Sequence, residues 1–152
     1  MTTDLHSTAP LTRQAVQATL HCLTGCAIGE VLGMVLATWW GWANGPSIAL
    51  SIVLAFGFGY SLTLVPLVRA GLGWRRATRL ALAADTLSIV TMEVMDNAAV
   101  LVVPGAMAAG LTDALFWASL AASLVVAFVV TVPVNRWLIA RGRGHAVVHA
   151  HH

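Results

Sequence analysis

The stretch HCLTGCAIGEVLGMVLATWWGW, residues 21–42, decides the fold class of this chain. Apolar residues dominate it, and Glu30 is its only residue with a formal charge at pH 7. A helix needs about 20 apolar residues to cross the hydrocarbon core of a bilayer. The stretch therefore predicts a membrane-spanning helix, which we expect to run from Val16 to Trp42.

The composition of the whole chain points the same way. Of its 152 residues, 59% are hydrophobic and 9% are charged, whereas about 25% are charged in a typical soluble domain. Further apolar stretches follow, separated by segments rich in Gly, Pro or Arg. We predict spans over roughly Pro46–Val68, Arg79–Val103 and Leu111–Leu138. The expected fold is an all-α integral membrane four-helix bundle.

The chain divides into three parts on this interpretation. Residues 1–15 are an N-terminal segment, residues 16–138 the membrane domain, and residues 139–152 a histidine-rich tail. The first span is too long for the apolar part of a signal peptide and lacks a small-residue cleavage site, so we expect it to be retained. The histidines of the tail are typical of metal-binding tracts: His145, His149, His151 and His152.

Arginines set the expected orientation. They lie before the first predicted span, around the loop between the second and third, and after the fourth: Arg13, Arg69, Arg75, Arg76, Arg79, Arg136, Arg141 and Arg143. Cytoplasmic loops of membrane proteins carry an excess of basic residues. We therefore expect both termini in the cytoplasm. The net charge of +2 comes from these arginines, and it gives no reason to expect nucleic-acid binding.

Most of the acidic residues fall inside the predicted spans: Glu30, Asp85, Glu93 and Asp96. A carboxylate at the centre of a bilayer costs about 2.5–3.5 kcal/mol on insertion scales, so such residues nearly always face the interior of a bundle. We expect all of them to face inward.

The polar residues of the first and third spans match in depth. Cys22, Cys26 and Glu30 follow one face of the first span at intervals of four residues. Both spans run outward from the cytoplasm, so Cys22 falls level with Asp85, and Glu30 with Glu93. The sequence predicts one interior site shared by these two helices.

Glycines run beside that face of the first span, at positions 25, 29 and 33. Small residues at this spacing are typical of close helix packing in membranes. The second and fourth spans carry only mild polar residues, and we expect these helices to act as walls, with Tyr60 as the one candidate participant.

Soft metal ligands gather in the same region: His21, Cys22, Cys26, Met34, Met92 and Met95. Cysteine and methionine favour Cu(I), and zinc accepts cysteine and histidine. We predict a Cu(I) ion captured by the histidine and the two cysteines, with zinc as an alternative. Packing is the competing interpretation, because buried cysteine and methionine commonly fill hydrophobic cores.

The buried carboxyl groups suit a second role beside a metal ion. Hard oxygen ligands favour protons, Mg²⁺ or Mn²⁺ over Cu(I), and neighbouring carboxyls in a low dielectric share protons. We expect Glu30, Asp85, Glu93 and Asp96 to balance the charge of the ion or to relay protons. Alternatively, protonated carboxyls hydrogen-bond between helices.

A motif on each of the two polar helices resembles those of a known family. The first is His-Cys-x-x-Gly-Cys-x-x-Gly-Glu, which begins at His21, and the second is Met-Glu-x-Met-Asp-Asn, which begins at Met92. The family comprises small four-helix bacterial membrane proteins of unknown function. The resemblance covers about His21 to Arg136, and it implies the fold, a bacterial plasma membrane and a link to copper handling.

These observations lead us to expect a multi-pass membrane protein that binds Cu(I) in its interior for transport or sensing. Its partners would be the lipid bilayer, the metal ion and, in a homo-oligomer, further copies of the chain. The alternatives are a redox protein linked to haem or quinone, although no second histidine lies within a span, and a scaffold subunit of a larger complex. No hydrolase, phosphate-binding or nucleotide motif is visible, so an enzyme is not favoured.

Overall fold

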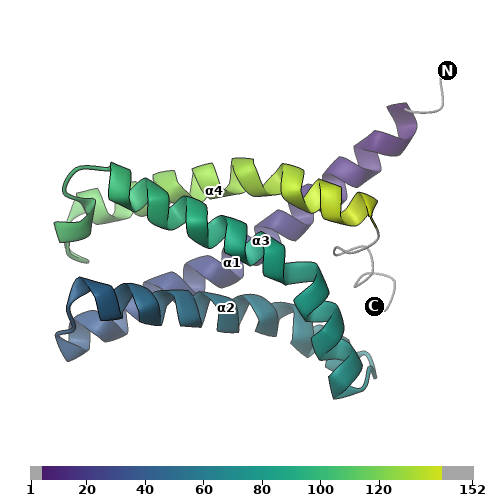
Figure 1. The fold of residues 1–152 in the computed structure, drawn as a ribbon, viewed down its shortest axis with the longest axis horizontal. Coiled ribbons are helices and arrows are strands. Elements are labelled where there is room, and N and C mark those ends of the chain that lie inside the picture. Colours follow the sequence, from purple (N-terminus) through teal and green to yellow (C-terminus); the bar gives the residue numbers. More distant parts are fainter. Residues whose placement is uncertain (1–4, 142–152) are drawn as a thin grey trace.

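The chain folds into four long helices, each antiparallel to the next (Figure 1). In the computed structural model they are α1 (Leu5–Trp40), α2 (Asn44–Arg69), α3 (Trp74–Val102) and α4 (Ala114–Ala140), with one 3-10 turn, η1 (Ala106–Ala108). The structure describes residues 5–141, with the backbone alone for residues 5–10 and 107. These described residues form no strand, and the predicted all-α four-helix fold is confirmed.

The predicted helix boundaries lie within three residues of the observed ones except at the start of α3, which begins at Trp74 and not at the predicted Arg79, and at the start of α1. This helix begins at Leu5, well before the predicted Val16, so residues 5–15 of the expected N-terminal segment belong to the helix. Ala15 and Ala18 are buried there in one cluster with Ile139 of α4. This contact packs the part of α1 around residues 15–18 against the end of α4. The histidines of the tail lie outside the described residues.

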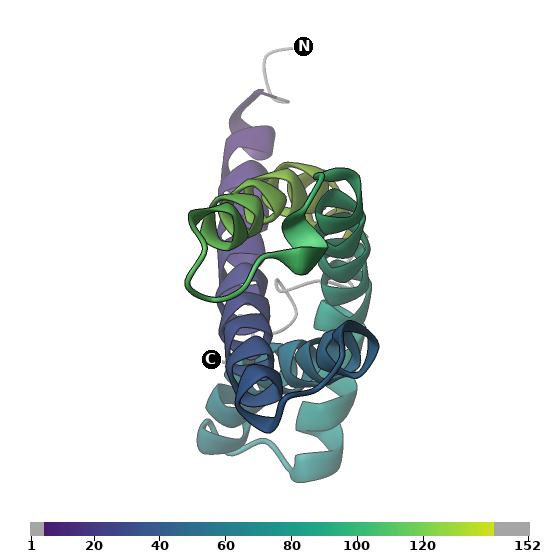
Figure 2. The same cartoon turned by 90° about the vertical axis from the view of Figure 1, so that its left-hand side faces the viewer.

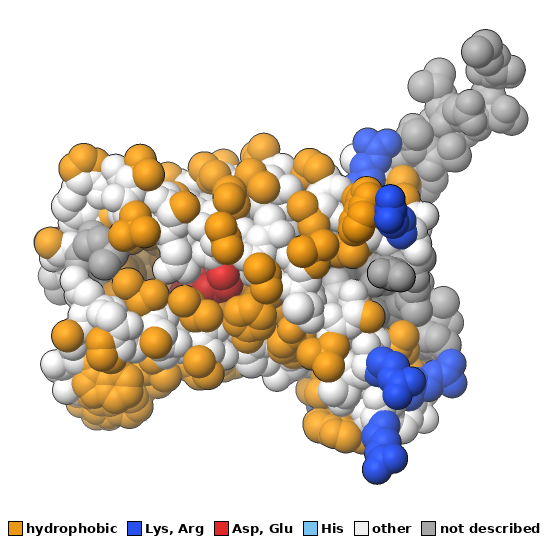
Figure 3. Space-filling model, viewed as in Figure 1, with side chains coloured by type: hydrophobic (Ala, Val, Ile, Leu, Met, Phe, Trp, Pro, Cys, Tyr) orange, Lys and Arg blue, Asp and Glu red, His pale blue; other side chains and the backbone are white. Residues whose placement is uncertain are grey.

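The helices pair as two hairpins, α1–α2 and α3–α4, which Figure 2 shows from the end where both hairpins turn. We call this the turn end; it consists of residues 41–43 and the longer connection 103–113. The arginine side chains of the described residues gather at the opposite end, the arginine end, where α1 begins, α2 joins α3 and α4 finishes (Figure 3).

The outside of the bundle is apolar and much of the inside is polar. Three stretches are long and apolar enough to cross a membrane: Leu11–Trp40, Asn44–Arg69 and Ala114–Ala140. The 29-residue α3 is also long, but its buried face includes Asp85, Glu93 and Asp96, which lower its hydropathy. Figure 3 shows hydrophobic side chains spread over the long sides of the bundle. A lipid environment fits this distribution.

Glycines bring α1 into close contact with α2. A Cβ atom added at Gly25 would lie 2.8 Å from Cα of Gly59, and one added at Gly29 would collide with the backbone of Ala55. Real Cβ atoms do not approach backbone this closely, so only glycine fits at these positions. The close helix packing predicted for the glycine stripe is confirmed.

Candidate functional site

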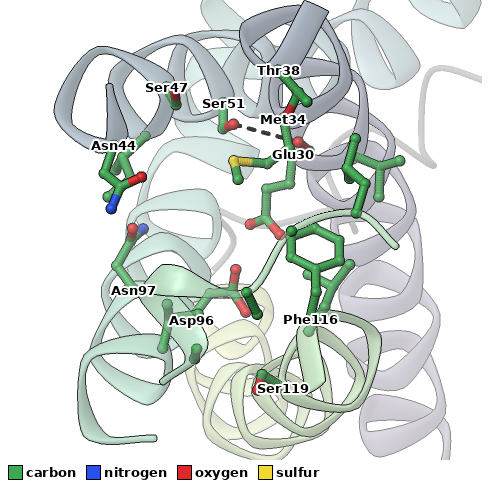
Figure 4. A pocket seen from close by; sticks show the side chains of 18 of the residues that line it. Glu30, Met34, Thr38, Asn44, Ser47, Ser51, Asp96, Asn97, Phe116 and Ser119 are labelled. Atoms are coloured by element: carbon green, nitrogen blue, oxygen red, sulfur yellow. Dashed lines mark hydrogen bonds between the residues drawn. The ribbon is translucent and has the colours of Figure 1, made fainter. Parts of the chain in front are cut away.

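A cavity of about 480 Å³ lies between the two hairpins, in the half of the bundle nearer the turn end. All four helices and the 103–113 connection contribute to its lining (Figure 4). None of its described lining residues is basic. Its polar lining residues are Glu30, Thr38, Asn44, Ser47, Ser51, Glu93, Asp96, Asn97 and Ser119.

Three carboxyl groups meet at this cavity. Glu30, Glu93 and Asp96 are 8%, 5% and 6% exposed, and the Glu30 carboxyl lies close enough to the other two to interact with their charge. Figure 4 shows Glu30 from α1 and Asp96 from α3 pointing toward one another. We call these residues the carboxyl cluster. The similar depths of the polar residues along the first and third predicted spans indicated that α1 and α3 bring these carboxyls together, and the structure confirms this.

The carboxyls of the cluster interact mainly with one another and with the neighbouring Cys26. Both carboxyl oxygens of Glu93, Oε2 of Glu30 and Oδ1 of Asp96 are buried without a hydrogen-bond partner among the described residues. Buried polar groups are normally hydrogen-bonded, and each exception needs an explanation. No described basic residue lines the cavity either, so no cationic side chain among the lining residues balances a charge on these carboxyls.

Backbone contacts fix the helices that carry these carboxyls. The Ser51 hydroxyl of α2 donates a hydrogen bond to the carbonyl oxygen of Glu30, over 3.4 Å. The Asn97 amide donates to the carbonyl oxygen of Glu93, over 2.8 Å. The first bond joins α2 to α1 and the second lies within α3; both use main-chain acceptors, and neither engages the side-chain carboxyls that line the cavity.

The two cysteines lie next to the carboxyl cluster, toward the arginine end. Cys22 and Cys26 are free and buried, and they share one core cluster with Ile89 and Met92. The Cys22 thiol donates a weak hydrogen bond to Oδ1 of Asp85, over 3.8 Å. The predicted proximity of Cys22 to Asp85, at the same depth on α1 and α3, is confirmed.

The other predicted metal ligands do not lie together at one site. Nε2 of His21 lies 3.2 Å from the Thr63 hydroxyl of α2, whereas the adjacent Cys22 faces α3. Met34 lines the cavity, and Met95 packs against the core cluster that contains the cysteines. Within residues 5–141, no group of three or more His, Cys, Asp or Glu side chains is arranged to hold a metal ion.

A buried polar network connects three helices between the cysteines and the arginine end. The Ser88 hydroxyl of α3 donates to Oδ1 of Asn135, and the Asn135 amide of α4 donates to the Thr19 hydroxyl of α1 over 2.8 Å. Thr19 in turn donates to the carbonyl of Ala15. All three side chains in the network are at most 1% exposed, so the network is buried in the core of the bundle.

Sequence reasoning missed these contributions from α2 and α4. Small and polar residues repeat every fourth position along the buried face of each helix: Ser47, Ser51, Ala55, Gly59 and Thr63 on α2, and Ser119, Ser123, Ala127, Thr131 and Asn135 on α4. This spacing is the signal that would have identified them. Tyr60, the expected participant, instead pairs its hydroxyl with Thr86 at an exposed position.

Replacing Asn135 tests the network. We expect Asn135→Leu to lower the free energy of unfolding by about 1–2 kcal/mol, because Thr19 and Ser88 lose their shared partner; hydrogen bonds between membrane helices contribute up to about 1.7 kcal/mol. Unfolding in mixed detergent micelles measures this change. The control is Ser61→Ala, which removes only an exposed bond to Gly57 within α2. Equal stabilities for the two variants would contradict the network.

Comparison with known families assigns the chain to a family of unknown function. Residues 12–144 match a domain of unknown function, DUF4396. The match covers most of the chain and all four helices, so the chain belongs to this family. Comparison with curated proteins and with solved structures gave no match.

Proposed function

We propose that this DUF4396 protein is a multi-pass membrane protein that binds a cation inside its helix bundle, for transport or sensing. One observation carries the proposal: the carboxyl cluster is buried around a cavity with unpartnered oxygens and no described basic neighbour. Such groups inside a membrane protein typically mark an ion pathway or a proton relay.

The arrangement along the bundle supports binding from one side. The cavity occupies the half nearer the turn end. Beyond the carboxyl cluster, the core residues Cys26, Ile89 and Met92 are almost completely buried, and the network around Asn135 follows. A cation that enters from the turn end therefore reaches the carboxyls and stops there. Onward movement requires this packed region to open, as alternating access would do.

Cu(I) is the metal ion that we propose for this site, with zinc as the alternative. Met34 lines the cavity together with the carboxyls, while Cys26 and Met92 lie in the adjoining core. Thioether and thiolate sulfur are preferred ligands of Cu(I). The carboxyls would balance its charge, and the His-Cys motif that begins at His21 would be a family feature.

A competition titration tests the metal. Purified protein is titrated with Cu(I) against a chromophoric chelator, and we expect the double variant Cys22→Ser/Cys26→Ser to lose Cu(I) binding. Ser61→Ala is the control with both thiols intact. Unchanged Cu(I) affinity in the double variant would remove the sulfur ligands from the proposal. A Soret band in the purified protein would favour haem instead, and the absence of any bound cation would favour a scaffold.

We further propose that both termini lie in the cytoplasm of a bacterium and that all four helices cross its plasma membrane. The arginine end is then cytoplasmic, as the excess of basic residues on cytoplasmic loops predicts. Reporter fusions after Asn44 and Gly110 should be external, and fusions at Gly73 and at the C-terminus internal. Opposite locations for the two termini would contradict this topology.

A further inference from the structure

The size of the cavity points beyond a metal ion. Its volume of about 480 Å³ is many times the roughly 30 Å³ that one water molecule occupies in the liquid. It falls within the range of about 300–1,000 Å³ that is typical of small-molecule sites. A bare metal ion would leave most of this space unused, whereas an organic ligand would occupy it.

The lining combines apolar walls with one concentrated charged region. Apolar side chains come from α2, α3 and α4, among them Ile48, Ile52, Val100, Phe116 and Leu120. The charged region is the carboxyl cluster, and its Glu93 is only 5% exposed with both carboxyl oxygens unpartnered. A ligand that satisfies both parts needs a positive group attached to an apolar body.

The acidic region is visible from the side of the bundle. Figure 3 shows an acidic side chain in a hollow rimmed by hydrophobic side chains, and Figure 1 places this hollow between α2 and α3. This side of the bundle would face lipid in the proposed topology. An amphipathic ligand therefore has a route to the carboxyls from the bilayer as well as from the turn end.

We propose that the cavity binds an amphipathic organic ammonium ion. Its nitrogen would lie at Glu30, Glu93 and Asp96, and its apolar part would lie against the walls. Phe116 and Trp42 also line the cavity, and an aromatic ring within about 6 Å attracts a cation. The inference rests on the proposed cation site and names a class of cation for it. A free amine and the ethanolamine headgroup of a lipid share this chemistry.

Calorimetry on the full chain tests the inference. In detergent without added lipid, hexylammonium is compared with hexanol, which has the same chain but no charge. We expect hexylammonium to bind at least about tenfold more tightly, and Glu93→Gln to remove at least about tenfold of that affinity, since bonds to charged groups have this strength. Asp113→Asn is the matched control, because Asp113 lies at the same end outside the cavity lining.

Further experiments test the role of Phe116 and distinguish a free amine from a lipid headgroup as the ligand. Phe116→Leu, which keeps every carboxyl and an apolar wall, should weaken hexylammonium binding more than hexanol binding. In nanodiscs, phosphatidylethanolamine should compete with hexylammonium if the lipid headgroup is the ligand, and should leave its binding unchanged if the ligand is a free amine. Equal binding of hexylammonium and hexanol overturns the inference. If Cu(I) binding still depends on Glu93 in that case, the proposed cation site stands; if neither ligand depends on Glu93, both fail.

Discussion

Glu93→Gln is expected to make the folded protein more stable while it weakens cation binding. The amide keeps the shape of the side chain, removes one negative charge from the carboxyl cluster and supplies N–H donors for the unpartnered carboxyl oxygens of Glu30 and Asp96. Leaving such a group unsatisfied costs about 1–3 kcal/mol, so the free energy of unfolding should rise by about that amount. The lost negative charge should reduce the affinity for the bound cation at least about tenfold.

A variant that gains stability and loses affinity identifies a functional site. Groups that bind ligands commonly lack hydrogen-bond partners in the empty protein and so reduce its stability. Detergent unfolding and Cu(I) titration of the same preparation measure the two quantities. Asp113→Asn, at the start of α4 and exposed, should change neither. A Glu93→Gln protein that is less stable and binds cations as before would show that the carboxyl serves helix packing.

Gly29→Ala should cause the largest loss of stability of any single methyl addition in the bundle. The new Cβ would collide with the main chain of Ala55, which has no flexible side chain to move aside. The two helices must separate, and overpacking of this kind costs about 1–3 kcal/mol or more. The expected result is a lower free energy of unfolding and a reduced yield of folded protein.

Gly57→Ala is the control for this prediction. Nothing lies within 4 Å of a Cβ added at Gly57, and alanine is favoured over glycine inside a helix by about 0.5–1 kcal/mol. This variant should therefore be as stable as the unmodified protein or more so. Similar losses at the two positions would show that the contact between α1 and α2 is not what makes Gly29 necessary.

The helices and part of the site follow from patterns that the sequence states directly. Long apolar stretches predict the four helices. Intervals of four residues place Cys22 and Glu30 on one face of α1, and the parallel course of α1 and α3 sets Cys22 against Asp85 and Glu30 against Glu93. These relations depend only on helical geometry and relative depth, which is why they could be derived without a structure.

The position of His21, the polar contacts of the other helices and the cavity could not be predicted, because they depend on contacts that helical periodicity does not determine. A step of about 100° separates adjacent residues on a helix, so His21 reaches Thr63 of α2 while Cys22 reaches α3. Serine and threonine can bond to their own helix, as Thr19 does to Ala15, and their sequence signal is therefore weak. The cavity arises from the distance between the hairpins and from the course of residues 103–113, which no periodicity specifies.

Carbodiimide labelling tests most directly whether the carboxyl cluster binds a cation. A hydrophobic carbodiimide reacts with protonated carboxyls inside membrane proteins, and peptide mass spectrometry locates the modified residue. We expect Glu93 or Glu30 to be labelled in the purified protein, and labelling to fall when Ag(I), as a stable substitute for Cu(I), or hexylammonium is present. Labelling at the same rate with and without every cation would contradict the proposal that the cluster is a cation site.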